Sequence, residues 1–219
     1  WLQCRDNAKR IPKKMRLNTI VRFLNKELKT SKIKDHSRNG LQVRGKKEVK
    51  KIVFGVDGCL ELFKRAKKEQ ADLIIVHHGL KWKGEKDQLG LRQKRINFLK
   101  KNKISLFVSH LPLDLNPIFG NNKLLCNMFN VEIQGMFAKH GNNNIGMYGK
   151  INSTLSTLVK KVNQKLNTKS LVHKFGPSKI KKIAVLSGCS PIDVYDAKKL
   201  GCDTYLTGEA KHSLYHINK

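Results

Sequence analysis

Apolar residues recur along this chain at two spacings, and each spacing predicts one kind of secondary structure. A stripe at helical spacing predicts an amphipathic helix over residues 16–29. Short, almost wholly apolar runs predict buried strands over residues 50–58, 71–79 and 104–110. Helical segments over 60–70 and 91–101 separate these runs. Because strands that alternate with helices favour a parallel sheet, the pattern predicts an α/β fold.

The middle of the chain has a weaker pattern. Residues 139–149 are rich in glycine and asparagine, and this composition predicts a loop. An apolar stripe from Leu155 to Leu166 then predicts another amphipathic helix. We expect Asn152 or Ser153 to be its N-cap.

An internal repeat is the clearest sign of organisation. KIVFGVDGCLELFKRAKKEQADLIIVHHG and KKIAVLSGCSPIDVYDAKKLGCDTYLTGE both read as strand, Gly-Cys turn, helix and a second strand led by aspartate. Cys59 and Cys189 lie 130 residues apart, and Asp72 and Asp203 lie 131 apart. This duplicated strand–helix–strand unit predicts two related α/β domains. The alternative is a chance similarity between two buried units.

The predicted domains cover residues 15–125 and 126–219. Residues 1–14 have no apolar periodicity, and we interpret them as a basic arm that is disordered or an artefact, with translation from Met15. The last residues, TGEAKHSLYHINK, stop in what reads as the middle of a helix, so we expect the second domain to be incomplete.

Charge changes this picture less than its size suggests. Lys+Arg number 45 against 16 Asp+Glu, so the formal net charge is +29. That balance invites a nucleic-acid interpretation. However, the lysines are spread along the chain, and aromatic residues, at 7%, form no stacking platform. AT-rich coding explains the lysine bias as well, so a nucleic-acid-associated basic protein is the weaker alternative.

The cysteines and the absence of long apolar runs indicate the cellular compartment. The five cysteines are odd in number and widely spaced, without a CxxC motif, which favours a reduced, cytoplasmic protein. No run of eighteen apolar residues occurs, so we expect no membrane span and no membrane partner.

The candidate chemistry lies where predicted strands end. Ligands of parallel sheets gather beyond the carboxyl ends of the strands. His77 and His78 end one strand, His110 ends the next, and Asp114 and Glu209 follow strand ends as well. Imidazole with carboxylate suits zinc, iron, manganese or nickel, and two ions bridged by Asp114 would use one histidine each. The alternatives are histidines that are buried and hydrogen-bonded, a proline turn, and a helix-capping Glu209.

Five motifs occur together in one order: NGLQVRG, VHHGLKWKGE, SHLPLD, GNN and YLTGEAKH. With them the chain resembles, from about Met15 to Lys219, the Nif-three-like family of dinuclear metal-binding proteins, also called GTP cyclohydrolase I type 2 homologues. The resemblance implies two intertwined α/β domains, a ring-shaped homohexamer and a two-metal site. It also implies His77, His78 and Asp114 as metal ligands, with His110 and Glu209 as candidate catalytic residues in the same pocket.

The family completes its site with a later GHxxTE motif, which this sequence does not reach. We interpret this as truncation. His212 or His216 as substitutes, or a degenerate site, are the alternatives.

Two functions use these ligands equally well. The first is a metal-dependent hydrolase in which a water that bridges two divalent ions attacks a nucleotide-like or other anionic substrate. His110 or Glu209 would move protons, and Lys81 and Lys83 would attract the anion. The second is a non-catalytic metal-handling protein.

Overall fold

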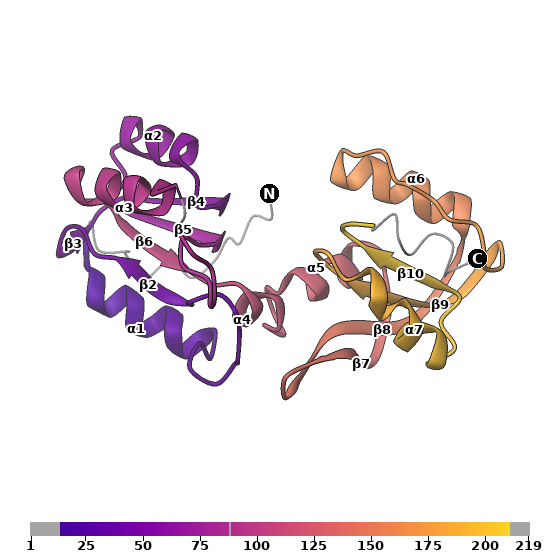
Figure 1. Cartoon of the computed structure of the whole chain (residues 1–219). Helices are drawn as coiled ribbons and strands as arrows, with labels where there is room; N and C mark the ends of the chain where they lie inside the picture. Colours follow the sequence, from indigo (N-terminus) through magenta and orange to yellow (C-terminus); the bar gives the residue numbers. More distant parts are fainter. Residues whose placement is uncertain (1–13, 88, 211–219) are drawn as a thin grey trace. The chain divides into compact units, whose positions relative to one another are not determined.

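The computed structural model describes residues 14–87 and 89–210, and Figure 1 shows the arrangement of their helices and strands. The chain divides between Pro112 and Leu113 into two units, and each has its own sheet. Both sheets carry helices, so the α/β fold predicted from the sequence is confirmed. Residues 1–13 of the predicted arm lie outside the described residues, as do His212 and His216.

The first unit is built on a four-stranded sheet in the order β2-β6-β5-β4. Strands β4, β5 and β6 are parallel, and β2 is antiparallel to β6. The elements are β1 (Met15–Arg16), α1 (Leu17–Glu27), β2 (Gly40–Val43), β3 (Glu48–Val49), β4 (Ile52–Asp57), α2 (Leu60–Lys68), β5 (Leu73–His78), α3 (Leu91–Lys101) and β6 (Ser105–Val108). The short helix α4 (Leu111–Asp114) contains the division between the units.

Burial of apolar side chains holds β5 and β6 in this sheet. One face of the two strands packs against α2 and α3, through residues such as Ile74, Leu106, Phe63 and Leu99, all fully buried. Each such side chain contributes about 1.5–3 kcal/mol on burial. The carboxyl ends of β5 and β6 are therefore fixed at one edge of the sheet, where the histidines follow.

The second unit has a mixed sheet in the order β10-β9-β8-β7. Only β9 and β10 are parallel; the other pairs are antiparallel. The elements are α5 (Asn121–Met128), β7 (Glu132–His140), β8 (Asn143–Thr154), α6 (Leu155–Leu166), β9 (Lys179–Leu186), the 3₁₀ helix η1 (Pro191–Asp193), α7 (Val194–Lys199) and β10 (Thr204–Thr207). Helix α5, in which the predicted domain boundary falls, contributes the buried Cys126 to the core of this unit.

The loop predicted over residues 139–149 is wrong, because these residues belong to a long antiparallel hairpin. Strands β7 and β8 pair from Glu132 and Lys150 to His140 and Asn143. The glycines that suggest a loop instead allow close cross-strand contact: a Cβ at Gly149 would lie 2.0 Å from the carbonyl oxygen of Glu132. Glycine here serves the approach of two strands rather than a flexible connection.

The predicted N-cap of α6 is also wrong. Asn152 and Ser153 lie within β8, and the cap is Thr154, whose hydroxyl accepts a hydrogen bond from the backbone N–H of Thr157 at 3.2 Å. Since the strand continues directly into the helix, the capping residue is the last residue of the strand.

Both copies of the repeat form the predicted strand–helix–strand unit, as β4-α2-β5 and β9-α7-β10. They share one backbone anchor. Asp72 and Asp203, each just before the second strand, accept hydrogen bonds from two successive backbone N–H groups, just before β4 for Asp72 and in the first half of β9 for Asp203. The donors are Lys50 and Lys51 at 2.9 and 3.3 Å for Asp72, and Lys181 and Lys182 at 2.8 and 2.9 Å for Asp203.

We expect Asp72→Ala to lower the free energy of unfolding by about 2–4 kcal/mol at pH 7, because a buried carboxylate loses charge-assisted hydrogen bonds. Burial by itself raises the pKa of Asp72, but hydrogen bonds from Lys46 and from two backbone N–H groups hold that pKa below its usual 3.8. The carboxylate therefore stabilises the fold above its unfolded-state pKa, and this contribution is lost as the pH falls through the folded-state pKa.

Urea unfolding at several pH values measures this effect. The difference between wild type and Asp72→Ala should shrink as the pH falls below about 4. Asp203→Ala is the matched control: it removes the same kind of backbone anchor but, among the described residues, no ion pair with a lysine, so the loss of stability should be smaller. Equal stability of wild type and Asp72→Ala at pH 7 would contradict the anchoring role.

Candidate metal centre

Three histidines from two strand ends come together in the first unit. His77 and His78 close β5, and His110 follows two residues after β6. One ring nitrogen from each histidine lies within 4.8 Å of the other two. The ring centroids are 4.6 Å apart for His77 and His78, and 5.0 and 5.6 Å from these rings to His110. The three imidazoles can therefore hold a metal ion.

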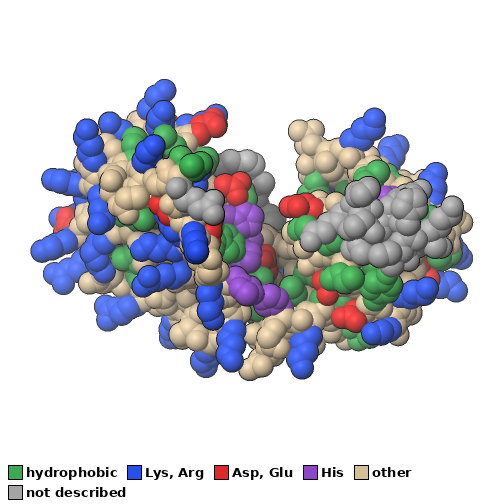
Figure 2. Space-filling view, in the orientation of Figure 1, with side chains coloured by type: hydrophobic (Ala, Val, Ile, Leu, Met, Phe, Trp, Pro, Cys, Tyr) green, Lys and Arg blue, Asp and Glu red, His purple; other side chains and the backbone are tan. Residues whose placement is uncertain are grey.

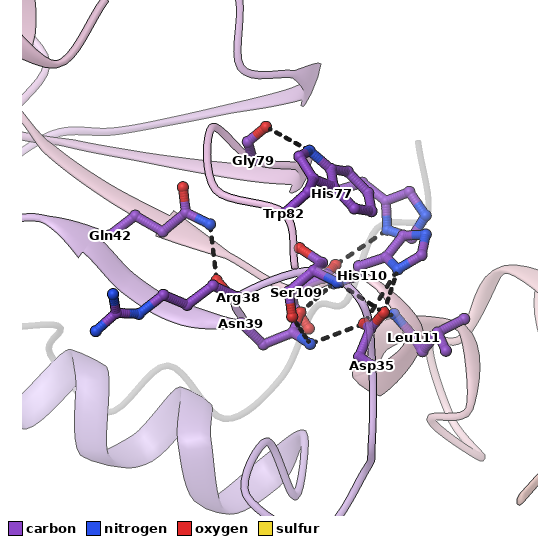
Figure 3. Close-up of polar contacts among 11 residues, drawn as sticks. Asp35, Arg38, Asn39, Gln42, His77, Gly79, Trp82, Ser109, His110 and Leu111 are labelled. Carbon is purple, nitrogen blue, oxygen red and sulfur yellow. Dashed lines mark hydrogen bonds and ion pairs between the residues drawn. The ribbon is translucent and has the colours of Figure 1, made fainter. Parts of the chain in front are cut away.

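The Nδ1 atom of each ring meets an oxygen acceptor, and Figure 3 shows two of these contacts. The partners are the carbonyl oxygen of Ser109 for His77 at 3.0 Å, Asp57 for His78 at 2.7 Å, and Asp35 for His110 at 2.9 Å. A carbonyl oxygen only accepts, so the Nδ1 of His77 must donate, and the lone pair of the neutral ring is on Nε2. Histidines that ligate metals in proteins are commonly held in this way.

Asp35 is the most strongly bound of these acceptors. Its side chain is only 2% exposed, and both oxygens contact His110. It also accepts from the backbone N–H groups of Ser37 and Leu111 and from the side-chain amide of Asn39. Burial would raise the pKa of Asp35, but these hydrogen bonds outweigh burial and hold the pKa well below its usual range. A negative charge therefore lies beside the His110 ring.

The NGLQVRG motif fastens the loops that carry the histidines. The side-chain oxygen of Asn39 accepts a hydrogen bond from the backbone N–H of His110 at 2.7 Å. Gln42 accepts the backbone N–H groups of Leu80 and Lys81, just after the His-His pair, at 2.8 and 3.2 Å. These two motif residues therefore hold the histidine-bearing segments in place. Figure 3 shows Asn39 next to Asp35 and Ser109.

Gly79, the glycine of the HHG motif, is required by space. A Cβ at this position would lie 2.6 Å from both the side-chain amide of Gln42 and a methyl group of Val108. Any larger residue would push the strand end away from β6 or break the contact of Gln42 with the loop.

Trp82 forms one wall of the histidine cluster. Its indole N–H donates to the carbonyl oxygen of Gly79 at 3.1 Å. The ring is edge-on to His110, with centroids 5.0 Å apart, and lies 6.0 Å from His78. Figure 3 shows Trp82 close to His77 and His110. The partly buried indole covers part of the imidazole surface.

Sequence reasoning missed Asp35, Asp57 and Trp82 as parts of the site. Trp82 lies inside the VHHGLKWKGE motif, so the motif itself was a usable signal. Asp57 ends β4, the strand beside β5, and the strand-end rule that selected the histidines also covers this residue. Asp35 carries no such signal, because it lies in a polar loop 75 residues from His110.

Two predicted site residues, Asp114 and Glu209, belong to the second unit. Asp114 is 7% exposed, and its carboxylate accepts from the side-chain amide of Asn121 at 2.6 Å. Glu209 is exposed, and its backbone N–H donates to Gly188 at 3.2 Å. Their roles as metal ligand and catalytic residue stay predictions.

The GNN motif has a structural role in the second unit. Asn122 is fully buried, donates to the carbonyl oxygen of Ile145 at 2.7 Å, and accepts from the backbone N–H of Ser187 at 2.7 Å. It therefore ties α5 to β8 and to the residue that follows β9. Its neighbour Asn121 orients Asp114.

The fold and the histidine cluster define an α/β protein with a centre that can hold a metal ion, and comparisons with known proteins identify its family. Residues 15–219 match the model of the family Duf34/NIF3 (NGG1p interacting factor 3). A "GTP cyclohydrolase 1 type 2 homolog" from Archaeoglobus fulgidus is 37% identical over 205 residues, which cover 94% of this chain and 82% of that protein. A protein of the same name from Haemophilus influenzae is 36% identical over 201 residues, covering 90% and 80%. The chain belongs to the Duf34/NIF3 family.

Solved structures agree with this assignment. The structure of the protein ybgI, described as of unknown function, has a TM-score of 0.85 and 31% identity, and the match covers 92% of this chain and 81% of that one. The structure of TTHA1606 from Thermus thermophilus has a TM-score of 0.80 and 30% identity, covering 93% and 81%. Within residues 14–87 and 89–210, no helix is long and apolar enough to cross a membrane.

Trp82 provides a direct test of whether an ion binds beside it. The chain has two tryptophans, so Trp1→Phe leaves Trp82 as the only one. We expect Ni²⁺ or Co²⁺ to quench its fluorescence in a saturable way, because a paramagnetic ion on the histidines would lie close to the indole. The control carries His77→Ala and His110→Ala in addition and should show no quenching at the same concentrations. Ion binding without any change in emission would contradict this placement.

Proposed function

We propose that this protein binds divalent metal ions through His77, His78 and His110 and uses them to hydrolyse a small anionic, nucleotide-like substrate. The observation that carries the proposal is the convergence of three imidazoles, each with its Nδ1 against an oxygen acceptor. Membership of a family whose curated members are called GTP cyclohydrolase 1 type 2 homologs supports the choice of a nucleotide-like substrate.

The donor set fits a transition metal. Imidazole suits zinc, iron and nickel, whereas manganese prefers more oxygen. We expect two ions, and the SHLPLD motif offers Asp114 as a candidate further ligand. The two carboxylates behind the rings, Asp35 and Asp57, would offset part of the positive charge of the ions.

Bound divalent ions would supply Lewis acidity and activate water at neutral pH. The protein's own groups would do the rest. Lys81 and Lys83, which flank Trp82, would attract the anion. His110 donates a hydrogen bond from Nδ1 to Asp35, so a ring that also binds metal has no nitrogen left for proton transfer. We therefore assign His110 to metal binding, and Glu209 stays a candidate for proton transfer on the strength of the sequence motif alone.

A non-catalytic, metal-handling protein is the alternative, because the histidine cluster is evidence for metal binding but not, by itself, for catalytic turnover. The nucleic-acid alternative gains nothing from the structure. Lys and Arg side chains are spread over the visible face of the first unit in Figure 2 rather than gathered in one patch. The expected homohexamer and the cytoplasmic location stay predictions.

Loss of one ligand should weaken metal binding strongly. We expect His77→Ala or His78→Ala to lower affinity for Zn²⁺ by more than about 100-fold, since even residues behind metal ligands contribute about 10–100-fold. Competition with a chromophoric chelator measures this affinity. His173→Ala, in the second unit, is the control and should bind as wild type. Wild-type affinity in both cluster variants would contradict the metal site.

Turnover separates the hydrolase from the metal-handling alternative. Metal-loaded protein should hydrolyse at least one compound in a panel of nucleoside triphosphates and other small anionic esters. The rate should fall at least about 100-fold after chelation, in His77→Ala, and in Asp114→Ala. Tight metal binding with no turnover of any compound would contradict the hydrolase and support metal handling.

A further inference from the structure

We propose that Asp35 is a positioning residue that fixes the ring of His110 in the tautomer and orientation needed to bind metal. This inference rests on the proposed metal site. It concerns a carboxylate that would not itself bind the ion, since its oxygens are directed at His110 and at the backbone around it (Figure 3).

The three ring partners differ in how firmly they are held. Asp57, the partner of His78, has a side chain that is 67% exposed, and His78 itself is 42% exposed. Asp35 is 2% exposed and His110 is 21% exposed. Water screens the first pair, whereas the second pair lies in a region of low dielectric constant, where a charge-assisted hydrogen bond is stronger.

The carboxylate of Asp35 has no freedom to turn. The backbone N–H groups of Ser37 and Leu111 donate to it at 3.0 Å each, and the amide of Asn39 donates at 2.8 Å. Asn39 in turn accepts the backbone N–H of His110. One short segment, residues 35–39, therefore holds both the ring and the main chain of His110.

This arrangement selects one tautomer of His110. A proton on Nδ1 points at a carboxylate oxygen 2.9 Å away, and the lone pair is then on Nε2. The other neutral tautomer would place the Nδ1 lone pair against the carboxylate, and two acceptors would face each other. Asp35 therefore keeps Nε2 of His110 ready to bind a metal ion.

The test compares Asp35→Asn with Asp57→Asn in Zn²⁺ affinity, measured by chelator competition on the full chain. Asparagine keeps the side-chain volume, but one of the two carboxylate oxygens is replaced by an NH₂ group that donates hydrogen bonds. The side chain then cannot accept hydrogen bonds from all the donors around Asp35. We expect Asp35→Asn to weaken binding about 10–100-fold. Asp57→Asn changes the exposed pair of Asp57 and His78, and should lower the Zn²⁺ affinity about fivefold at most.

A double-mutant cycle separates positioning from a purely structural role. If Asp35 acts through His110, then Asp35→Asn should change affinity by less than about twofold in a His110→Ala background. An equal loss in both backgrounds would mean that Asp35 only supports the fold, and would overturn the proposal. So would wild-type affinity in a folded Asp35→Asn variant.

A measurement on the wild type covers the case in which Asp35→Asn does not fold. Long-range ¹⁵N–¹H spectra of the metal-free protein at pH 8 should show His110 protonated on Nδ1 alone. A ring protonated on Nε2 would overturn the positioning role. Failure of the wild type to take up any divalent ion would instead contradict the proposed function, whatever the tautomer of His110.

Discussion

The parallel pairing of β5 with β6 is the constraint on which the site depends. Val76 and Val108 are register partners, and both are buried. A shift of one residue would move Ile74 and Leu106 to the opposite face of the sheet, away from the core that they form with α2 and α3, so the core fixes the register. His77 and His78 then lie beside the start of the segment that carries His110. The geometry of the candidate metal centre is in this sense a consequence of ordinary apolar packing.

Hydrogen bonds from polar residues then fix the positions of the histidine-bearing segments more closely than apolar packing does. Asn39 and Gln42 each accept backbone N–H groups from a histidine-bearing segment, and Gly79 lets that segment approach closely. None of these three residues carries a side chain suited to the proposed chemistry. The residues of the NGLQVRG motif therefore hold the site in place, whereas the histidines supply the chemistry.

The sequence predicted the α/β fold, the repeated unit and the histidines at strand ends, because each leaves a local pattern or follows from the rule for parallel sheets. It did not predict the β7–β8 hairpin, since glycine composition does not distinguish a turn from a close contact between strands, as at Gly149. Asp35 was missed for a different reason. Its contact with His110 joins two polar positions 75 residues apart, and only the folded chain brings them together.

The fold, the family and the histidine cluster together make metal binding the central claim about this protein. X-ray absorption spectroscopy of the zinc-loaded full chain tests that claim most directly, because it reports the ligands of the ion itself. We predict imidazole scattering with Zn–N distances of about 2.0–2.1 Å, lost when His77, His78 and His110 are all replaced by alanine. A shell of oxygen alone, or the same imidazole signal in the triple variant, would contradict it.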